Sequence, residues 1–233
     1  SGDTINLLAI IGSINWIALR TRPDISWAVS RAAHYVTRDP HEAFRRLKHV
    51  CQYLLATLSF RLVFQPISSN CIHTLSVYTD ASFAPTGAES HEGLVILHGA
   101  RPDDPTSGNV VMWKSVRQRL VTKSTCESEL LACSNGLEQA ENLGMQLAEA
   151  TRTPIAYTLH CDNSAACKQI RDGPNGSFRT RHISVKGLWV HQMVSLGVDL
   201  QFTPTTKQVA DALTKGLGAQ RLPHVMSQLH LEM

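Results

Sequence analysis

The sequence lacks a long apolar run and a secretion signal. Its longest nearly apolar stretch, Leu7 to Leu19, is interrupted by Ser13 and Asn15. This stretch is shorter than the roughly 20 apolar residues that a helix needs to cross a bilayer. No positively charged leader precedes an apolar segment, so nothing in the sequence indicates secretion. We therefore expect no membrane as a partner.

Cysteine pairs are also missing. None of the six cysteines forms a C-x-x-C pair, and none has the spacing to a cysteine or histidine that is typical of a zinc site. We therefore expect free thiols in a reducing compartment rather than disulfides. The cysteines are Cys51, Cys71, Cys126, Cys133, Cys161 and Cys167.

Charge is nearly balanced overall but unevenly distributed. The 233 residues are 43% hydrophobic and 18% charged, with a formal net charge of +3, which is typical of a folded domain. Bases outnumber acids eight to four in residues 1–70 and nine to five in 151–233, whereas acids outnumber bases ten to five in 71–150. Carboxylates gathered for metal ions between phosphate-binding surfaces would give this pattern, and so would ordinary scatter of surface charge. Because the chain starts with Ser1-Gly2 and not with methionine, we expect a piece of a longer protein.

Three helical patterns open the chain. The first spans about Thr4 to Leu19, the second ends at Tyr35, and the third begins at Pro40 after the cap residue Asp39. Apolar residues of the third helix, from Phe44 to Leu55, are expected to form one buried stripe. Three bases lie off that stripe, where a solvated face and a nucleic-acid contact are both open interpretations: Arg45, Arg46 and Lys48.

From Arg61 onward the pattern predicts strands that alternate with helices. Gly, Pro, Asp and Ser turns separate the early strands, and longer helical stretches separate the later ones. This order predicts an α/β fold with a mixed sheet and helices packed on it. The expected strands are Arg61–Phe64, Thr74–Thr79, Gly93–His98, Asn109–Lys114 with an extension to Val121 left open, Pro154–Cys161 and Val198–Phe202. The expected helices are Ser124–Ala150, Asn163–Ile170, Arg181–Ser195 and a last one from about Gln208.

Two aspartates follow apolar strands. Asp80 ends the first long strand and Asp162 ends the fourth. Ligands of α/β proteins gather at the carboxyl ends of the strands. The two carboxylates therefore share a site if these strands are parallel neighbours, whereas the competing interpretation makes each a helix cap or turn former.

Three further acids belong to helices. Ser124 and Glu127 form a capping box, in which Glu127 accepts from the backbone N–H of Ser124, so Glu127 has a structural task. Glu129 lies instead on a small-residue face suited to packing against a sheet, and a buried carboxylate is costly unless it is paired or binds a metal. Asp211 is predicted in the first turn of the last helix, where the helix dipole also favours a negative charge.

Taken in order, Asp80, Glu129, Asp162 and Asp211 resemble the D-E-D-D constellation of the RNase H family. From about Ile5 to Leu217 the chain also resembles the end of a copia-type LTR retrotransposon Pol polyprotein. The motifs that carry this second resemblance are Ile11-Gly12-Ser13, Thr21-Arg22-Pro23-Asp24-Ile25, Arg179-Thr180-Arg181-His182-Ile183, Gln208-Val209-Ala210-Asp211 and Leu213-Thr214-Lys215. Two features depart from the family: Ser90-His91-Glu92-Gly93 stands in place of an R-S-T-S-G-like stretch, and the loop Thr203–Gln208 lacks the histidine of cellular enzymes.

The resemblance implies an RNase H-like mixed five-stranded sheet with flanking helices over residues 71–233. It implies a small three-helix segment over residues 1–65, similar to the thumb or connection of a reverse transcriptase. The polymerase palm with its Y-x-D-D signature is absent from this sequence. The implied activity is metal-dependent endonucleolytic hydrolysis of the RNA strand of RNA–DNA hybrids during reverse transcription.

The implied cofactor is a pair of Mg²⁺ ions, for which Mn²⁺ substitutes. By the family's pattern Asp80 bridges both ions, Glu129 and Asp162 hold the ion nearer the leaving group, and Asp211 holds the ion that activates water. The candidate substrate-binding residues are Ser82, Asn163, Arg117, Arg179 and His182.

The implied partners are the RNA–DNA hybrid and the polymerase domain, and a homodimer is left open. The implied location is the cytoplasm, within retrotransposon particles, with the nucleus as an alternative. A non-catalytic hybrid-binding or polymerase-docking module of the same fold is the alternative function. A transposase-type nuclease ranks last because it calls for a D-D-E order.

Overall fold

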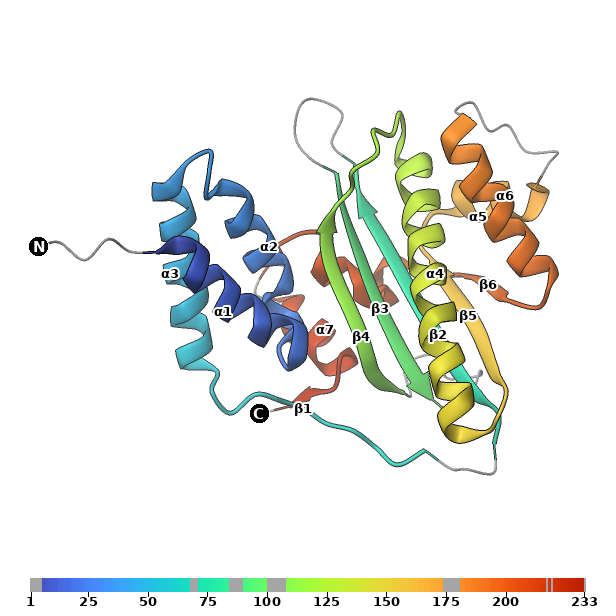
Figure 1. The fold of residues 1–233 in the computed structure, drawn as a ribbon, viewed down its shortest axis with the longest axis horizontal. Coiled ribbons are helices and arrows are strands. Elements are labelled where there is room, and N and C mark those ends of the chain that lie inside the picture. The colour runs from blue at the N-terminus through green and yellow to red at the C-terminus, as the bar shows by residue number, and fades with distance from the viewer. Residues whose placement is uncertain are drawn as a thin grey trace, which may run out of the picture.

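The computed structural model describes residues 6–67, 71–83, 90–99, 108–173, 181–216, 218 and 220–232, with the backbone alone for 181 and 182. A mixed five-stranded sheet organises most of the chain (Figure 1). Its strands are β2 (His73–Ser82), β3 (His91–Gly99), β4 (Asn109–Arg117), β5 (Ile155–Cys161) and β6 (Asp199–Phe202).

The strand order is β4-β3-β2-β5-β6. The first three strands pair antiparallel as hairpin neighbours, whereas β2 with β5 and β5 with β6 pair parallel. Helical connections lead to β5 and β6, as parallel pairing requires. The sheet confirms the predicted α/β class with a mixed five-stranded sheet.

Helices cover both faces of the sheet. On one face lie α4 (Thr125–Thr151), α5 (Ser164–Asp172) and α6 (Arg181–Ser195), and α4 crosses β2, β3 and β5 (Figure 1). The other face carries the 3₁₀ turn η4 (Val209–Leu213) and the short helix α7 (Leu222–Gln228). Each face has its own apolar core, so the sheet is buried on both sides.

The N-terminal helices form a third core beside β4. They are α1 (Leu7–Arg20), α2 (Ser26–Tyr35), preceded by the 3₁₀ turn η1 (Pro23–Ile25), and α3 (Pro40–Ala56). This confirms the three predicted helices, and Asp39 caps the third. The expected apolar stripe of α3 was too wide, because Phe44 and Leu55 are 44% and 70% exposed. The helix packs through the narrower row that contains Ala43, Leu47 and Val50.

A buried ion pair joins these helices to the segment after them. The guanidinium of Arg22 lies 2.7 Å from a carboxylate oxygen of Asp24 and donates to the Thr57 carbonyl at 2.9 Å. It also lies over the rings of Tyr53 and Phe60. The T-R-P-D stretch therefore has a structural task in this chain.

We expect Asp24→Ala to lower the free energy of unfolding by about 3 kcal/mol, because it leaves the buried Arg22 charge without its carboxylate. Urea denaturation followed by circular dichroism measures this change. The matched control is Glu42→Ala, which removes surface pairs with Arg45 and Arg46 and should change stability little. Equal losses in both variants would contradict the assignment.

The end of the chain differs from the prediction. Where an α-helix was expected from about Gln208, the structure has the 3₁₀ turn η4, and the helix α7 begins later, at Leu222. The strand expected at Arg61–Phe64 is the two-residue β1 (Arg61–Leu62), which pairs antiparallel with β7 (Leu231–Glu232). A third short 3₁₀ turn, η3 (Thr205–Lys207), precedes η4. At its own end β4 stops at Arg117, so the extension toward Val121 does not form.

None of the six cysteines, all of which lie among the described residues, forms a disulfide, as predicted. Among the described residues, no helix combines the length and the apolar character needed to cross a membrane.

Candidate metal centre

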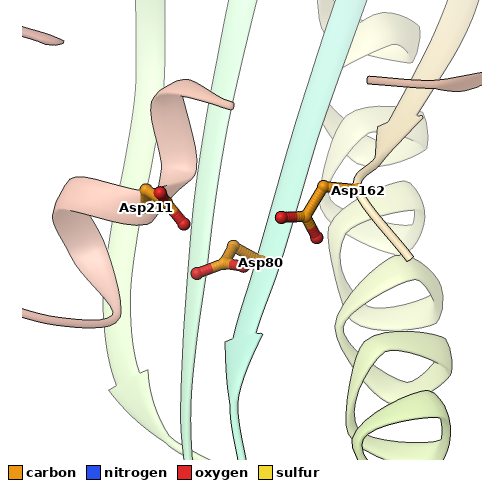
Figure 2. A group of neighbouring side chains, drawn as sticks. All are labelled: Asp80, Asp162 and Asp211. Carbon is orange, nitrogen blue, oxygen red and sulfur yellow. The ribbon is translucent and has the colours of Figure 1, made fainter. Parts of the chain in front are cut away.

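Parallel pairing of β2 with β5 brings Asp80 beside Asp162. Thr79 lies opposite Cys161 in this ladder, so the next residue of each strand is an aspartate (Figure 2). Asp80 lies within β2, and Asp162 directly follows β5. Asn163 supplies the side-chain cap of α5, so Asp162 is not that cap. The predicted meeting of the two aspartates is present, although Asp80 lies inside β2, which continues to Ser82, and not at the predicted strand end.

The third aspartate comes from η4. This turn lies close against β3, since a Cβ on Gly93 would come within 2.7 Å of the Ala210 carbonyl oxygen. The Gln208 side chain donates to the Thr79 carbonyl at 3.0 Å and ties the start of the turn to β2. Asp211 is thereby fixed over the sheet, fully buried, on a 3₁₀ turn and not on the predicted α-helix.

Ligand oxygens of Asp80, Asp162 and Asp211 all lie within 4.8 Å of one another (Figure 2). Hydroxyl and cationic groups surround them. Thr214 donates a hydrogen bond to Asp80, and Thr205 donates one to Asp162 at 3.0 Å. Two cations pair with Asp211: Lys215, at 2.8 Å, and Arg221.

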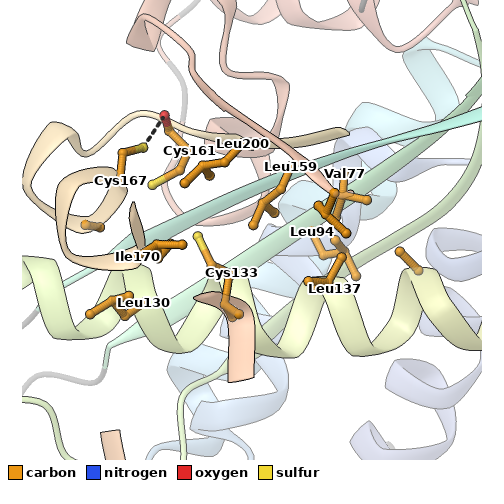
Figure 3. Packing of buried hydrophobic residues seen from close by; sticks show 14 of the residues in the cluster. Val77, Leu94, Leu130, Cys133, Leu137, Leu159, Cys161, Cys167, Ile170 and Leu200 are labelled. Carbon is orange, nitrogen blue, oxygen red and sulfur yellow. Dashed lines mark hydrogen bonds between the residues drawn. The ribbon is translucent and has the colours of Figure 1, made fainter. Parts of the chain in front are cut away.

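Glu129 projects from the first turns of α4, near but outside this group of three. Apolar and small side chains fix the helix on the sheet, among them Cys133 and Leu137 (Figure 3). One carboxylate oxygen of Glu129 accepts the Ala81 N–H at 3.2 Å. The other oxygen is buried and has no hydrogen-bond partner among the described residues. Gly136 shows how close the helix lies, because a Cβ there would come within 2.5 Å of the Thr79 side chain.

Burial and mutual repulsion favour the protonated forms of these acids. Burial first, and then the charge of Asp211, raise the pKa of Asp80 to about 7. Burial together with the charges of Asp80 and Asp162 raises the pKa of Glu129 to about 9. The pKa of Asp162 is raised as well, chiefly by burial. Clustered carboxylates with such pKa values fit a divalent cation, because hard oxygen ligands bind Mg²⁺ and its charge offsets their repulsion.

The capping box at the start of α4 is present with one difference. Ser124 accepts the Glu127 N–H at 3.2 Å, as predicted. The Glu127 carboxylate accepts the N–H of Lys123 at 2.6 Å, one residue before the predicted donor. Glu127 thus has a structural contact at the helix start and is absent from the three-aspartate group.

The predicted substrate-binding residues occupy different places. Ser82 ends β2 and its hydroxyl accepts the His91 N–H at 3.2 Å, while the Asn163 side chain caps α5. Arg117 ends β4 with an exposed side chain. Arg179 lies outside the described residues, and only the backbone of His182, in α6, is described. The substrate-binding roles of all five remain predictions.

A hollow with several basic residues lies on the α4 side of the β3–β4 hairpin. At its floor Glu92 accepts hydrogen bonds from Asn135, and Lys186 donates to the same amide at 3.0 Å. Burial raises the pKa of Glu92. The basic residues that line the hollow are Lys114, Arg117, Arg119 and Lys186.

Sequence reasoning did not identify Thr205, Thr214, Lys215 and Arg221 as neighbours of the carboxylates. Thr214 and Lys215 belong to the Leu213-Thr214-Lys215 motif, which could have identified them as site residues. Nothing in the sequence indicated which carboxylates they contact. Thr205 stands 43 residues after its partner Asp162, in a loop with no pattern of its own.

No family model matches this chain. It is 26% identical over 234 residues to the Retrovirus-related Pol polyprotein from transposon RE1 of Arabidopsis thaliana, covering 97% of this chain and 15% of that protein. It is 28% identical over 211 residues to the corresponding polyprotein from transposon TNT 1-94 of Nicotiana tabacum, covering 88% of this chain and 15% of that protein. It is 23% identical over 213 residues to the Transposon Ty1-JR2 Gag-Pol polyprotein of Saccharomyces cerevisiae, covering 89% of this chain and 12% of that protein. The chain thus spans about 15% of the length of the first of these relatives.

Among solved structures, RNase H1 from Halobacterium salinarum NRC-1 is 16% identical, with a TM-score of 0.45 over 60% of this chain and 94% of that one. LC11-RNase H1, solved in complex with an RNA/DNA hybrid, is also 16% identical with a TM-score of 0.45 over 60% of this chain and 93% of that one. The foamy viral protease-reverse transcriptase, also solved with an RNA/DNA hybrid, is 15% identical with a TM-score of 0.38 over 69% of this chain and 21% of that one.

Proposed function

We propose that this chain, a copia/Ty1-type retrotransposon Pol polyprotein region with an RNase H-like fold, is a metal-dependent endonuclease that cuts the RNA strand of RNA–DNA hybrids. The observation that carries the proposal is the meeting of three aspartates from three separate elements. Their oxygens lie within 4.8 Å, and a fourth acid, Glu129, is buried nearby with one oxygen lacking a hydrogen bond among the described residues. A structural role explains poorly a buried carboxylate oxygen that lacks a hydrogen bond, as in Glu129, beside three further clustered carboxylates.

Asp80, Asp162, Asp211 and Glu129 are the residues that would hold two Mg²⁺ ions, or Mn²⁺ in their place. When bound, such a pair of ions activates a water and stabilises the leaving 3′ oxygen of a phosphodiester. The protein's own task is to hold the carboxylates fixed and close together. The Thr214 and Thr205 hydroxyls orient two of them by hydrogen bonds, and the Ala81 N–H orients Glu129.

Substrate binding would use the groups around this centre. An RNA strand carries 2′-hydroxyls in a wide, shallow minor groove, and Ser82, Asn163 and Glu129 would hydrogen-bond there. Arg117 and the other basic residues that line the hollow would contact phosphates. The proposal also includes Arg179 and His182 as substrate-binding residues, as the sequence predicts. We also propose the polymerase domain of the same polyprotein as a partner and a retrotransposon particle in the cytoplasm as the location, with the nucleus as the alternative.

A cleavage assay on a hybrid with an end-labelled RNA strand tests the function. We expect RNA fragments to form with Mg²⁺ or Mn²⁺ and none to form with EDTA, with RNA–RNA and DNA–DNA duplexes of the same sequence left intact. Hybrid binding without metal-dependent cleavage would replace the proposal with the non-catalytic hybrid-binding module. Equal cleavage of all three duplexes would point to an unspecific nuclease.

A further inference from the structure

One helix of the N-terminal segment touches the loop that follows Asp211. The ring of Trp27, on α2, lies against the backbone of Gly216, where an added Cβ would come within 3.0 Å of two ring carbons. Only glycine leaves room for this contact without displacing the ring. The contact joins parts of the chain that are far apart in sequence, and it is independent of the carboxylates themselves.

Residues 214–216 connect that contact to the acidic group. Thr214 donates to the Asp80 carboxylate, and Lys215 pairs with Asp211 at 2.8 Å. Gly216 follows Lys215 directly and is exposed. The Trp27 ring packs against it at the point where the loop leaves the sheet. A shift of Gly216 would therefore move the side-chain partners of two aspartates.

Two further contacts place α1 and α2 against the same region of the sheet. The Ser30 hydroxyl lies 3.2 Å from the Nε2 atom of His91, whose N–H binds the hydroxyl of Ser82. The indole N–H of Trp113, on β4, donates to the Ala18 carbonyl at 2.7 Å. The same strand also contacts η4. On that strand the Ser115 hydroxyl donates to the Leu213 carbonyl at 2.6 Å.

We propose that Trp27 is a positioning residue of the metal centre, through which the helical segment fixes residues 214–216 and with them the carboxylates of Asp80 and Asp211. The inference rests on the proposed function in one respect, that these carboxylates bind divalent ions. It makes the N-terminal helices part of the catalytic unit and not a separate appendage. The specific contact that transmits the effect is the ring against the glycine.

The test uses the full chain with Trp27→Ala, Trp27→Phe and, as the matched control, Trp16→Ala, since Trp16 is 65% exposed on α1. Calorimetric titration with Ca²⁺ alone measures metal affinity without turnover, and single-turnover cleavage measures the rate. We expect Trp27→Ala to weaken Ca²⁺ binding by about threefold to tenfold. Trp27→Phe should recover only part of the affinity, because the shorter phenyl ring lacks the outer indole carbons that face Gly216, and Trp16→Ala should leave the affinity unchanged. In steady-state cleavage assays, KM for the hybrid should change less than kcat.

Gly216→Ala provides a second route that leaves the tryptophan in place. The added methyl group should push the loop from the ring and weaken Ca²⁺ binding in the wild-type background, but not in the Trp27→Ala background, where the space is empty. Additive losses, or a lower melting temperature with unchanged Ca²⁺ affinity and kcat, would overturn the positioning role. If the wild-type chain itself bound no Ca²⁺ and cleaved no hybrid, the proposed function would fail instead.

Discussion

Asp80→Asn should lower the rate of hybrid cleavage by about 10³-fold or more, because it removes the charge of the central carboxylate of the proposed metal centre. The same change should raise the melting temperature of the metal-free protein. Asp80 is buried beside Asp211, and an amide in its place carries no charge to be desolvated or repelled. The hydrogen bond from Thr214 can be accepted by the amide oxygen. Loss of activity with a gain in stability distinguishes a metal ligand from a structural residue.

Single-turnover cleavage and thermal melting in EDTA measure the two effects on the same preparation. Asp162→Asn should behave similarly in cleavage, with a smaller gain in stability, because Asp162 is more exposed. The matched control is Asp172→Asn, an exposed aspartate at the end of α5, outside the three-aspartate group. Unchanged cleavage in Asp80→Asn would refute the assignment of the centre.

The metal-free protein should lose stability as the pH rises from about 5 to 9. In the unfolded chain a carboxyl of this kind ionises near pH 4. In the folded state the pKa of Asp80 is about 7 and that of Glu129 about 9, so the folded state holds protons that the unfolded state has released. The free energy of unfolding therefore falls across this window. Because one pKa unit corresponds to about 1.4 kcal/mol, ionising Asp80 alone costs on the order of 4 kcal/mol.

Urea denaturation in EDTA at pH 5, 6, 7, 8 and 9 measures the dependence. Adding Mg²⁺ or Ca²⁺ should restore stability most strongly at high pH, where the carboxylates are ionised and the ion binds only the folded state. In the metal-free protein, Asp80→Asn should reduce the fall of the free energy of unfolding with pH below pH 7. The part of the fall that is due to Glu129 should remain. A metal-free stability that rises between pH 5 and 8 would contradict the assigned pKa directions.

Much of the fold could be predicted because its signals are local. Apolar strands bounded by turn residues, the Ser124 cap of α4 and the Asp39-Pro40 start of α3 each follow from neighbouring residues. The resemblance to the RNase H family implied the mixed five-stranded sheet that the structure has. The end of the chain could not be predicted, because η4 is set by its fit against Gly93 and β7 by its pairing with β1, both distant in sequence.

The candidate site was predicted in part for the same reason. Asp80 and Asp162 were expected together because a strand end is visible in sequence and parallel strands share an edge. The position of Glu129 beside the group, with its Ala81 contact, depends on how α4 packs across β2. Nothing in the sequence indicates which cations pair with Asp211 or which hydroxyls donate to the other two aspartates, so only the structure identifies these contacts.

The separation of Asp80 from Asp211 along the chain has a consequence for folding. The carboxylates meet only after a parallel strand pair has formed and η4 has docked on β3, both of which close long loops. Such non-local contacts are slow to form, and a chain is synthesised from its N-terminus. Metal binding should therefore be a late event in refolding. The time at which metal binding begins would report when η4 docks on the sheet. A chain that has folded only as far as β5 would hold two of the aspartates and no complete centre.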